Sequence, residues 1–344
     1  MNKPIETIMA GEIREIPDVI ARQINEGLAG YMEAGRKAAA SNPVGFVTCA
    51  RGTSDHAATF FKYVMEIQTG LPVASIGPSV ASIYETPLKL DNFICLSISQ
   101  SGGSPDLVAL QEAAKKGGAS TLAILNEVNS PLGHGTQTVL PVFAGPEKAV
   151  AATKSFVSSL FAILGFVAGF TQDKDLEKAL RGLPDVLRAA LTCDWSKAEL
   201  ALARARSVFT VGRGPGLAVA AEAALKLKET CRIHAEVFSS AEVLHGPVVL
   251  ADQKFAALLF DPEDRSRSSV EAAAKAMREK GAAAFSISSS MGPKMNLPVP
   301  VVTNPLVLPL IQITAFYSFV EVLAQNLGEN ADAPVGLNKV TVTM

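Results

Sequence analysis

The amino-acid sequence predicts an α/β protein made of two similar halves, each a mainly parallel sheet with helices on both faces. Short apolar runs alternate with helical stretches such as 57–68 and 106–116. Runs that are apolar on both faces and separated by helices are typical of a parallel sheet covered on both sides. The strands predicted for the first half are residues 44–49, 93–98, 121–125 and 139–143.

Two pairs of matching segments indicate that the α/β unit is duplicated. PVGFVTCARGTSDHAA and ARSVFTVGRGPGLAVA each place a strand before Arg-Gly, and KKGGASTLAI and REKGAAAFSI match in the same order. Both pairs are separated by nearly the same offset, about 160 residues, which is the signature of an internal repeat.

This repeat divides the chain into five expected parts. The first forty residues are expected to be helical, because Ile13, Ile16, Ile20 and Ile24 form one stripe. The expected parts are an N-terminal helical segment 1–40, a first domain 41–170, a helical connector 171–205, a second domain 206–328 and a C-terminal tail 329–344.

Composition narrows the class of protein. The 344 residues carry 31 Lys and Arg against 33 Asp and Glu, so no basic field exists to attract nucleic acid or an anionic membrane. The longest apolar stretch, 156–170, is shorter than the roughly 20 residues of a membrane span and is expected to be a buried helix. The four cysteines show no C-x-x-C spacing, and the N-terminus lacks the apolar core of a signal peptide. We therefore expect a cytoplasmic protein with reduced thiols.

The segment SISQSGGSPDL joins the carboxyl end of a predicted strand to the amino end of a predicted helix. Ligands of open parallel sheets bind at this edge, and helix N-terminal amides favour an anion. The two glycines let backbone N–H groups approach a ligand, while Ser99, Ser101 and Ser104 add hydroxyl donors. The loop is interpreted as a phosphate cradle, although a capped helix after a glycine turn explains it about equally well.

A second hydroxyl-bearing loop, Arg51-Gly-Thr-Ser54, follows the first strand and favours a sugar phosphate site at the same sheet edge. The matching loop of the second half, VGRGPGL, resembles a dinucleotide fingerprint. It fails that pattern because Leu217 stands where the third glycine belongs.

The predicted helix 217–233 places Glu222, Lys226 and Glu229 on one face. A solvated ion-pair ladder is the commoner meaning of this spacing. The functional alternative is a carboxylate that a nearby lysine keeps ionised, so that it can act as a base. Downstream, His245 precedes Gly-Pro and is therefore expected at an exposed turn, where a histidine is suited to proton transfer.

Several motifs occur together in the order seen in sugar isomerase (SIS) domain proteins. They are Gly52-Thr-Ser54, Ser99-Gln-Ser-Gly-Gly-Ser104, Leu225-Lys-Leu-Lys-Glu229, His234-Ala-Glu236, the stretch 242–247 and Leu337-Asn-Lys339. The chain resembles the isomerase half of glucosamine-6-phosphate synthase and, among tandem SIS proteins, most resembles the glucosamine-6-phosphate deaminases. The resemblance implies two tandem SIS domains with flavodoxin-like or Rossmann-like sandwiches.

The resemblance also implies roles for single positions. The phosphate would be bound by Ser99, Gln100, Ser101 and Ser104, and the sugar would be bordered by Thr53, Ser54 and the backbone around Val150. Glu229 would carry a proton between C1 and C2, supported by Lys226. His245 would open the pyranose ring and would come from the partner subunit of a homodimer. Lys339 would reach the sugar near C1 or C2.

The expected reaction is glucosamine 6-phosphate plus water to fructose 6-phosphate plus ammonia. The chain begins Met-Asn-Lys and enters its first helix almost at once, so the ammonia-releasing glutaminase of the synthase is not expected, and removal of the amine is the favoured direction. The resemblance implies no metal, nicotinamide or pyridoxal cofactor.

Alternatives remain open from the sequence. They are another SIS-type sugar phosphate isomerase, a galactosamine-6-phosphate deaminase, a fructosamine-6-phosphate deglycase and a sugar phosphate sensor without catalysis. A sensor needs only the cradle, so Glu229, His245 and Lys339 together favour an enzyme. Gly103, Leu244 and Asn338, the last of which lies outside the residues that the structure describes, depart from the residues usual in the family and leave the identity of the substrate open.

Overall fold

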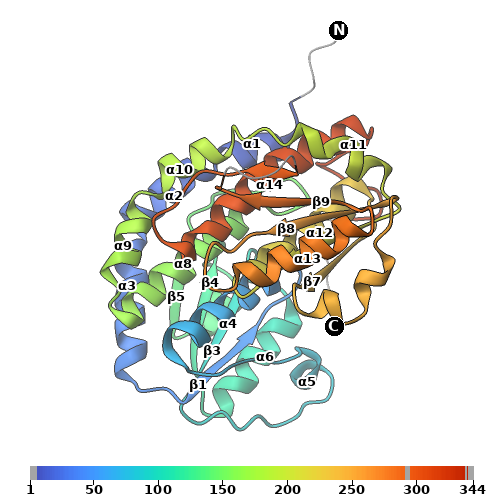
Figure 1. The fold of residues 1–344 in the computed structure, drawn as a ribbon. Helices are drawn as coiled ribbons and strands as arrows, with labels where there is room; N and C mark the ends of the chain where they lie inside the picture. Colours follow the sequence, from blue (N-terminus) through green and yellow to red (C-terminus); the bar gives the residue numbers. More distant parts are fainter. Residues whose placement is uncertain (1–5, 291–294, 338, 340–344) are drawn as a thin grey trace. The chain divides into compact units, whose positions relative to one another are not determined.

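The computed structural model describes residues 6–290, 295–337 and 339. The chain divides into two compact units, each with its own sheet. The first-sheet unit comprises residues 18–147 and 154–181, and the second-sheet unit comprises the other described residues. In Figure 1 the first sheet is blue to green and the second is yellow to orange-red.

The first sheet has five strands in the order β2-β1-β3-β4-β5, and every neighbouring pair is parallel. Its strands are β1 (Gly45–Cys49), β2 (Val73–Ser75), β3 (Phe93–Ser99), β4 (Ser120–Leu125) and β5 (Thr138–Pro141). β1 and β3 lie side by side with Cys49 opposite Ser97. The carboxyl ends of these two strands, and the loops that follow them, therefore share one edge.

Helices cover the first sheet, as its apolar strands require. Those of this part of the chain are α2 (Ile16–Glu26), α3 (Leu28–Ala40), α4 (Thr53–Thr69), α5 (Ser79–Ser82), α6 (Pro105–Lys116), α7 (Pro131–Gly135), α8 (Lys154–Thr171) and α9 (Lys174–Arg181). α3 packs along α8 so closely that a Cβ at Gly35 or Gly169 would overlap the backbone of the other helix. Small residues are required there for the two backbones to touch.

The second sheet repeats the topology of the first. Its order is β10-β9-β8-β6-β7, again parallel throughout. Its strands are β6 (Ser207–Gly212), β7 (Ala235–Ser239), β8 (Phe255–Phe260), β9 (Ala283–Ser288) and β10 (Asn296–Pro298). Taken in chain order, each strand occupies the same place as its counterpart in the first sheet, which confirms the predicted fold class of two parallel α/β units.

The remaining elements belong to the second-sheet unit. They are α1 (Ile8–Arg14), α10 (Leu183–Ala190), α11 (Ser196–Arg204), α12 (Gly216–Cys231), the 3₁₀ helices η1 (Glu242–His245), η2 (Pro247–Leu250) and η3 (Pro305–Val307), α13 (Arg267–Glu279) and α14 (Leu308–Asn326). The expected N-terminal helical segment is present, but as α1, α2 and α3 instead of one helix, with breaks at Glu15 and Gly27.

Two helical stretches of the described chain, residues 154–171 and 305–326, are long and apolar enough to cross a membrane. In the structure 89% and 83% of these windows, respectively, are buried. They are therefore core helices, as the sequence predicts for the first of them.

Candidate functional site

The loop between β3 and α6 has the form of an anion cradle. Ser99 Oγ accepts a hydrogen bond from the Gly102 N–H at 3.0 Å and so fixes the turn. Gly102 has φ of 60°, and a Cβ there would lie 2.7 Å from the Cβ of Ser130, so only glycine fits. A Cβ at Gly103 would meet only atoms of Ser101, at 3.9 Å or more, which is ordinary van der Waals contact, so the structure does not require glycine at that position.

The donors of this cradle face outward at the start of α6. Ser104 is the N-cap residue, but its side chain makes no capping hydrogen bond. Gln100, Ser101 and Ser104 are all partly exposed. Neutral hydroxyl and amide groups thus surround a helix N-terminus, an arrangement suited to an anion such as a phosphate.

The loop after β1 lies beside the cradle on the same sheet edge. Gly52 precedes α4 with φ of 53°, and Thr53 and Ser54 form the first residues of that helix, both partly exposed. An ion pair joins the two loops: the Nη2 and Nε atoms of Arg51 lie 2.6 Å and 2.8 Å from Oδ2 of Asp106. Sequence analysis did not predict this pair, because the partners are 55 positions apart.

On α12 the charged residues Glu222, Lys226 and Glu229 contact one another, but they do not form a solvent-exposed row of ion pairs. The Nζ atom of Lys226 lies 3.2 Å from Oε1 of Glu222 and 2.5 Å from Oε2 of Glu229. The side chains of Glu222 and Lys226 are 0% and 1% exposed, whereas that of Glu229 is 23% exposed. The expectation of a solvated ion-pair face is therefore wrong, because α12 is enclosed on the face that carries them.

Burial and charge act in opposite directions on Lys226. Burial alone lowers the pKa of Lys226, but attraction by Glu222 and Glu229 outweighs it and leaves the pKa above its ordinary value. Tyr317 of α14 donates a hydrogen bond to Oε1 of Glu222 at 3.0 Å. The lysine therefore stays charged. It contacts the carboxylate of Glu229, which is partly exposed to solvent.

His245 is the last residue of the short helix η1 and is exposed. Gly246 follows it with φ of 149°, a conformation that glycine alone adopts easily. The turn expected from the Gly-Pro sequence is present. Leu244, also exposed, stands beside the histidine.

Lys339 and the segment around Val150 lie together in the second-sheet unit. The Nζ atom of Lys339 donates a hydrogen bond to the carbonyl of Ala149 at 2.7 Å. The Val150 N–H donates to the carbonyl of Asp332 at 3.0 Å. The buried carboxylate of Glu12 accepts from the Ala149 N–H, at 3.3 Å for its Oε2. Sequence analysis missed these supports, since more than a hundred residues separate the partners.

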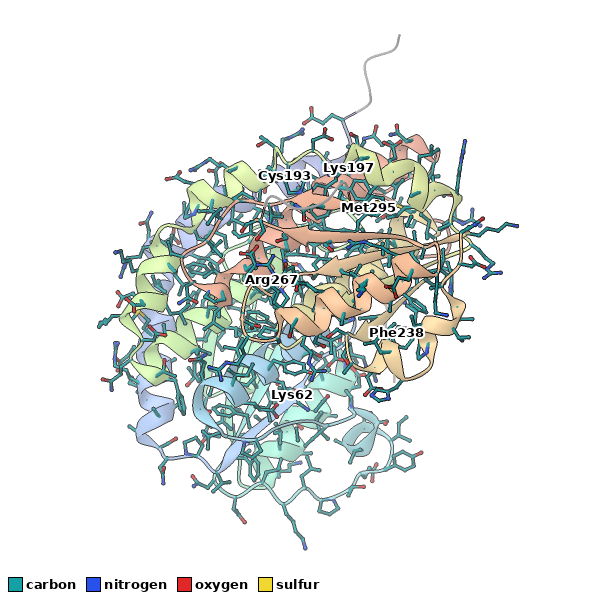
Figure 2. All side chains as sticks on the ribbon, in the orientation of Figure 1. Lys62, Cys193, Lys197, Phe238, Arg267 and Met295 are labelled. Atoms are coloured by element: carbon teal, nitrogen blue, oxygen red, sulfur yellow. The ribbon has the colours of Figure 1, made fainter. Side chains whose placement is uncertain are left out.

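In the described part of the chain, the matching edge of the second sheet is built differently. Glu263 accepts hydrogen bonds from the Ser289 N–H at 2.6 Å and from the hydroxyls of Ser288 and Ser289. Arg267, labelled in Figure 2, lies 3.0 Å from Oδ2 of Asp261. The donors of this edge are thus satisfied by carboxylates of the protein itself.

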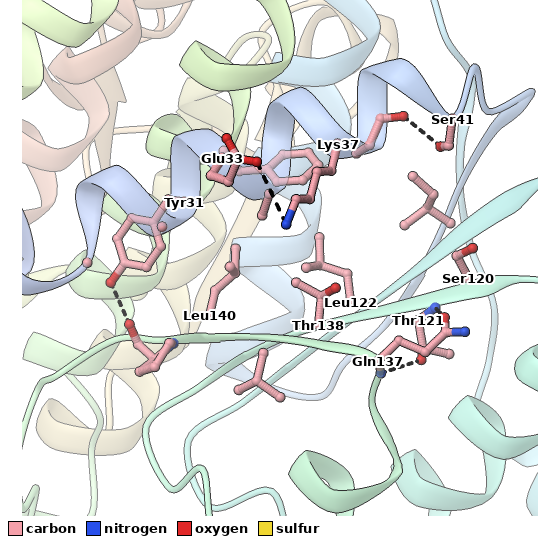
Figure 3. Close-up of a pocket in the computed structure, with 18 of the residues that line it drawn as sticks. Tyr31, Glu33, Lys37, Ser41, Ser120, Thr121, Leu122, Gln137, Thr138 and Leu140 are labelled. Carbon is pink, nitrogen blue, oxygen red and sulfur yellow. Dashed lines mark hydrogen bonds and ion pairs between the residues drawn. The ribbon is translucent and has the colours of Figure 1, made fainter.

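A separate hollow lies within the first-sheet unit. It measures about 560 Å³ and is bordered by α3 and by strands β3 to β5, with Tyr31, Lys37 and Gln137 among its lining (Figure 3). None of the predicted site residues, all of which the structure describes, lines it. Among the described residues, no group of three His, Cys, Asp or Glu side chains could hold a metal ion.

The predicted site residues thus form two sets. The first-sheet unit brings together Thr53, Ser54, Ser99, Gln100, Ser101 and Ser104 at one sheet edge. In the second-sheet unit, Lys226 contacts Glu229, and Lys339 contacts the segment that contains Val150. The same unit carries His245 on an exposed turn.

A model of the SIS domain matches residues 46–168 and 201–324, once over each sheet. The chain belongs to the SIS domain family. The two parallel sheets are its tandem SIS domains, and the family is one of sugar phosphate binding proteins.

Among curated SIS relatives, the glutamine--fructose-6-phosphate aminotransferase [isomerizing] of Zymomonas mobilis is 30% identical over 358 residues. That alignment covers 97% of this chain and 58% of the relative. The chain spans about half the length of the curated relatives it matches. It therefore resembles the part of these enzymes that holds their SIS domains.

Solved structures show the same tandem SIS fold. A protein of Silicibacter pomeroyi DSS-3, whose phosphosugar isomerase activity is itself proposed, is 41% identical with a TM-score of 0.89, and the match covers 95% of this chain and all of that one. A glucosamine-6-phosphate deaminase of Thermotoga maritima is 19% identical with a TM-score of 0.74, over 95% of this chain and 99% of that one. At that identity the deaminase shares only the fold, so the expected special likeness to deaminases is not supported.

Proposed function

We propose that the protein is a phosphosugar enzyme that converts glucosamine 6-phosphate and water to fructose 6-phosphate and ammonia. The support for the sugar is the match to enzymes named for fructose 6-phosphate and for isomerisation. The support for catalysis is the partly exposed carboxylate of Glu229, which forms an ion pair with the buried Lys226. This second observation carries the proposal, because a protein that only bound the sugar phosphate would need no such base.

The phosphate of the substrate is proposed to bind the loop 99–104. Ser101, Ser104 and Gln100 would donate hydrogen bonds to its oxygens, together with the first amides of α6. Ser99 would act mainly by fixing the turn, because its Oγ already accepts the Gly102 N–H. Thr53 and Ser54 would contact hydroxyls of the sugar.

The chemical steps are proposed to begin with His245, which moves a proton from the C1 hydroxyl to the ring oxygen and so opens the pyranose. Glu229 then takes the proton from C2 and delivers a proton, exchangeable with solvent, to C1. The oxygen at C1 gains a proton as the nitrogen at C2 gives one up, so the product is an imine at C2, which water hydrolyses to the ketone of fructose 6-phosphate and ammonia. Each step moves only protons and water, and the charges balance without an added oxidant or reductant.

Lys226 is proposed to hold the carboxylate of Glu229 in place, since its ammonium contacts Oε2 of Glu229 at 2.5 Å. Lys339 is proposed to stabilise negative charge that develops on the oxygen at C1 during proton transfer. The backbone around Val150, which Lys339 contacts through the Ala149 carbonyl, would border the sugar.

The protein is further proposed to act as a cytoplasmic homodimer in which His245 serves the partner subunit. The support is its position on an exposed turn. A side chain placed this way can complete a site on another copy of the chain.

An assay of ammonia and fructose 6-phosphate tests the proposal, with galactosamine 6-phosphate as comparator. Equal amounts of the two products from glucosamine 6-phosphate, lost in Glu229→Gln, are expected. Isomerisation of a sugar phosphate without ammonia would contradict the deaminase. Tight binding of glucosamine 6-phosphate without any turnover would contradict the assignment as an enzyme and favour a sensor.

A further inference from the structure

The ion pair between Arg51 and Asp106 stands at the edge of the phosphate cradle. Asp106 is the second residue of α6, the helix whose N-terminus ends the loop 99–104. Its side chain is 0% exposed, whereas that of Arg51 is 48% exposed. The two oxygens of Asp106 have different partners: Oδ1 accepts the Leu107 N–H at 2.9 Å, and Oδ2 accepts from Arg51.

The buried carboxylate of Asp106 should weaken binding of a phosphate at the N-terminus of α6. A phosphate monoester carries close to two negative charges near neutral pH. A negative charge in the first turn of the same helix repels it, and the repulsion is strong because a buried site screens charges poorly. The remaining groups of the loop 99–104 are neutral, so they cannot offset this charge.

Arg51 is the cation that the structure places on that carboxylate. Both Nε and Nη2 point at one oxygen, so the guanidinium orientation is fixed. The same contact ties the loop after β1, which continues into Thr53 and Ser54, to the start of α6. Asp55 on α4 also feels the charge of Arg51, which lowers the pKa of that carboxyl against the larger effect of burial.

We propose that Arg51 is a positioning residue of the phosphate site: it neutralises Asp106 so that the N-terminus of α6 can accept a dianion. The inference rests on the proposed role of the loop 99–104. It adds that Arg51 acts through Asp106 and not through a direct bond to phosphate.

A double-mutant cycle separates these two roles. Binding of inorganic phosphate and of glucosamine 6-phosphate is measured by calorimetry on the full chain, for the wild type, Arg51→Gln, Asp106→Asn and the double variant. We expect Arg51→Gln to weaken binding of both ligands about tenfold or more. The double variant should return to within about threefold of the wild type, because the uncompensated charge is gone.

A double variant that binds as weakly as Arg51→Gln would overturn the inference and indicate direct contact with phosphate. Unchanged binding in Arg51→Gln would also overturn it. If neither ligand binds the wild type, the proposed cradle fails, which is a different result from failure of the Arg51 role.

Two variants keep the test decisive if Arg51→Gln does not fold. Arg51→Lys retains the charge and should bind phosphate within a few-fold of the wild type. Asp106→Asn keeps an oxygen for the Leu107 N–H and removes the negative charge, so it should bind phosphate at least as tightly as the wild type. Weaker binding in Asp106→Asn would overturn the inference.

Discussion

The Nζ atom of Lys226 lies 2.5 Å from Oε2 of Glu229, and the lysine side chain is only 1% exposed. The two residues lie three positions apart on α12, so the helix itself sets their spacing. Glu222, one turn earlier, holds the same ammonium from the other side at 3.2 Å. The cation is thus fixed, and the carboxylate of Glu229 is the member of this cluster that can meet a substrate.

Replacement of Glu229 by Gln should lower turnover by a factor of about 100 to 10,000, because proton transfer by a positioned side chain contributes that much. Glucosamine 6-phosphate should still bind, since the amide keeps the shape of the side chain. Steady-state kinetics and calorimetry measure the two effects. Glu279→Gln, at an exposed position on α13, is the matched control and should keep wild-type kinetics. Equal losses in both variants would refute a specific role for Glu229.

Replacement of Lys226 by Met should destabilise the protein by about 3–5 kcal/mol, because it leaves Glu222 buried without its cation. Urea unfolding followed by circular dichroism measures the free energy. Lys275→Met removes a lysine whose side chain is 78% exposed and should change the free energy by no more than about 0.5 kcal/mol. A similar small change in Lys226→Met would mean that the cluster tolerates an unpaired carboxylate.

The two glycines of the cradle should respond differently to alanine. Gly102→Ala should cost about 2 kcal/mol or more, because φ is positive and the new Cβ would meet Ser130. It should also weaken sugar phosphate binding, since the turn carries the donors. Gly103→Ala, one position later, serves as the control and should leave both quantities near their wild-type values, because its Cβ would make only ordinary contacts with Ser101. Thermal unfolding and calorimetry check the pair, and equal effects would mean that the turn is not set by Gly102.

Asp55 gives a pH dependence of stability. Burial raises the pKa of Asp55, with His56 and Arg51 opposing the shift only in part. The folded state therefore holds this proton more tightly than the unfolded state, so ionisation of Asp55 costs stability as pH rises from the unfolded pKa, about 3.9, through the raised folded value. Asp55→Asn should be more stable than the wild type at pH 7, and the difference should vanish as pH falls toward 4. Urea midpoints between pH 4 and pH 7 measure it, and a constant difference would contradict the shift.

Mixed dimers test the proposed place of His245. Glu229→Gln and His245→Asn should each be inactive alone. If His245 serves the partner subunit, random mixing of the two after unfolding and refolding should restore about a quarter of the wild-type activity, because half of the dimers contain one intact site. A mixture that stays inactive although sedimentation shows exchanged dimers would place His245 in the site of its own chain.

Most of the fold could be predicted from the sequence, because its signals are local. Apolar runs predicted the bounds of β3 and β4 to within one residue. The Arg-Gly turns that follow both β1 and β6 indicated the repeat. The short strands β2 and β7 were not predicted, since a strand of three or five residues with exposed positions has little periodicity. The break between α1 and α2 was hidden by an isoleucine stripe that continues across it.

The site was less accessible to sequence reasoning, because its decisive feature is burial. Spacing placed Glu222, Lys226 and Glu229 on one face but could not tell a solvated face from an enclosed one. The contacts of Arg51 with Asp106 and of Lys339 with Ala149 join residues far apart in the chain, so no local sequence pattern predicts them. The glycine loop was different, because strand, glycine, N-cap and helix occur in one short segment.

Hydrogen exchange at carbon tests the account most directly. The protein is incubated with glucosamine 6-phosphate in D₂O, and the sugar phosphates are followed by proton NMR. The account predicts fructose 6-phosphate labelled with deuterium at C1, because Glu229 exchanges its proton with solvent between C2 and C1. It also predicts that Glu229→Gln abolishes the labelling while calorimetry still detects binding. Labelling that persists in Glu229→Gln would show that another group carries the proton and would contradict the central claim.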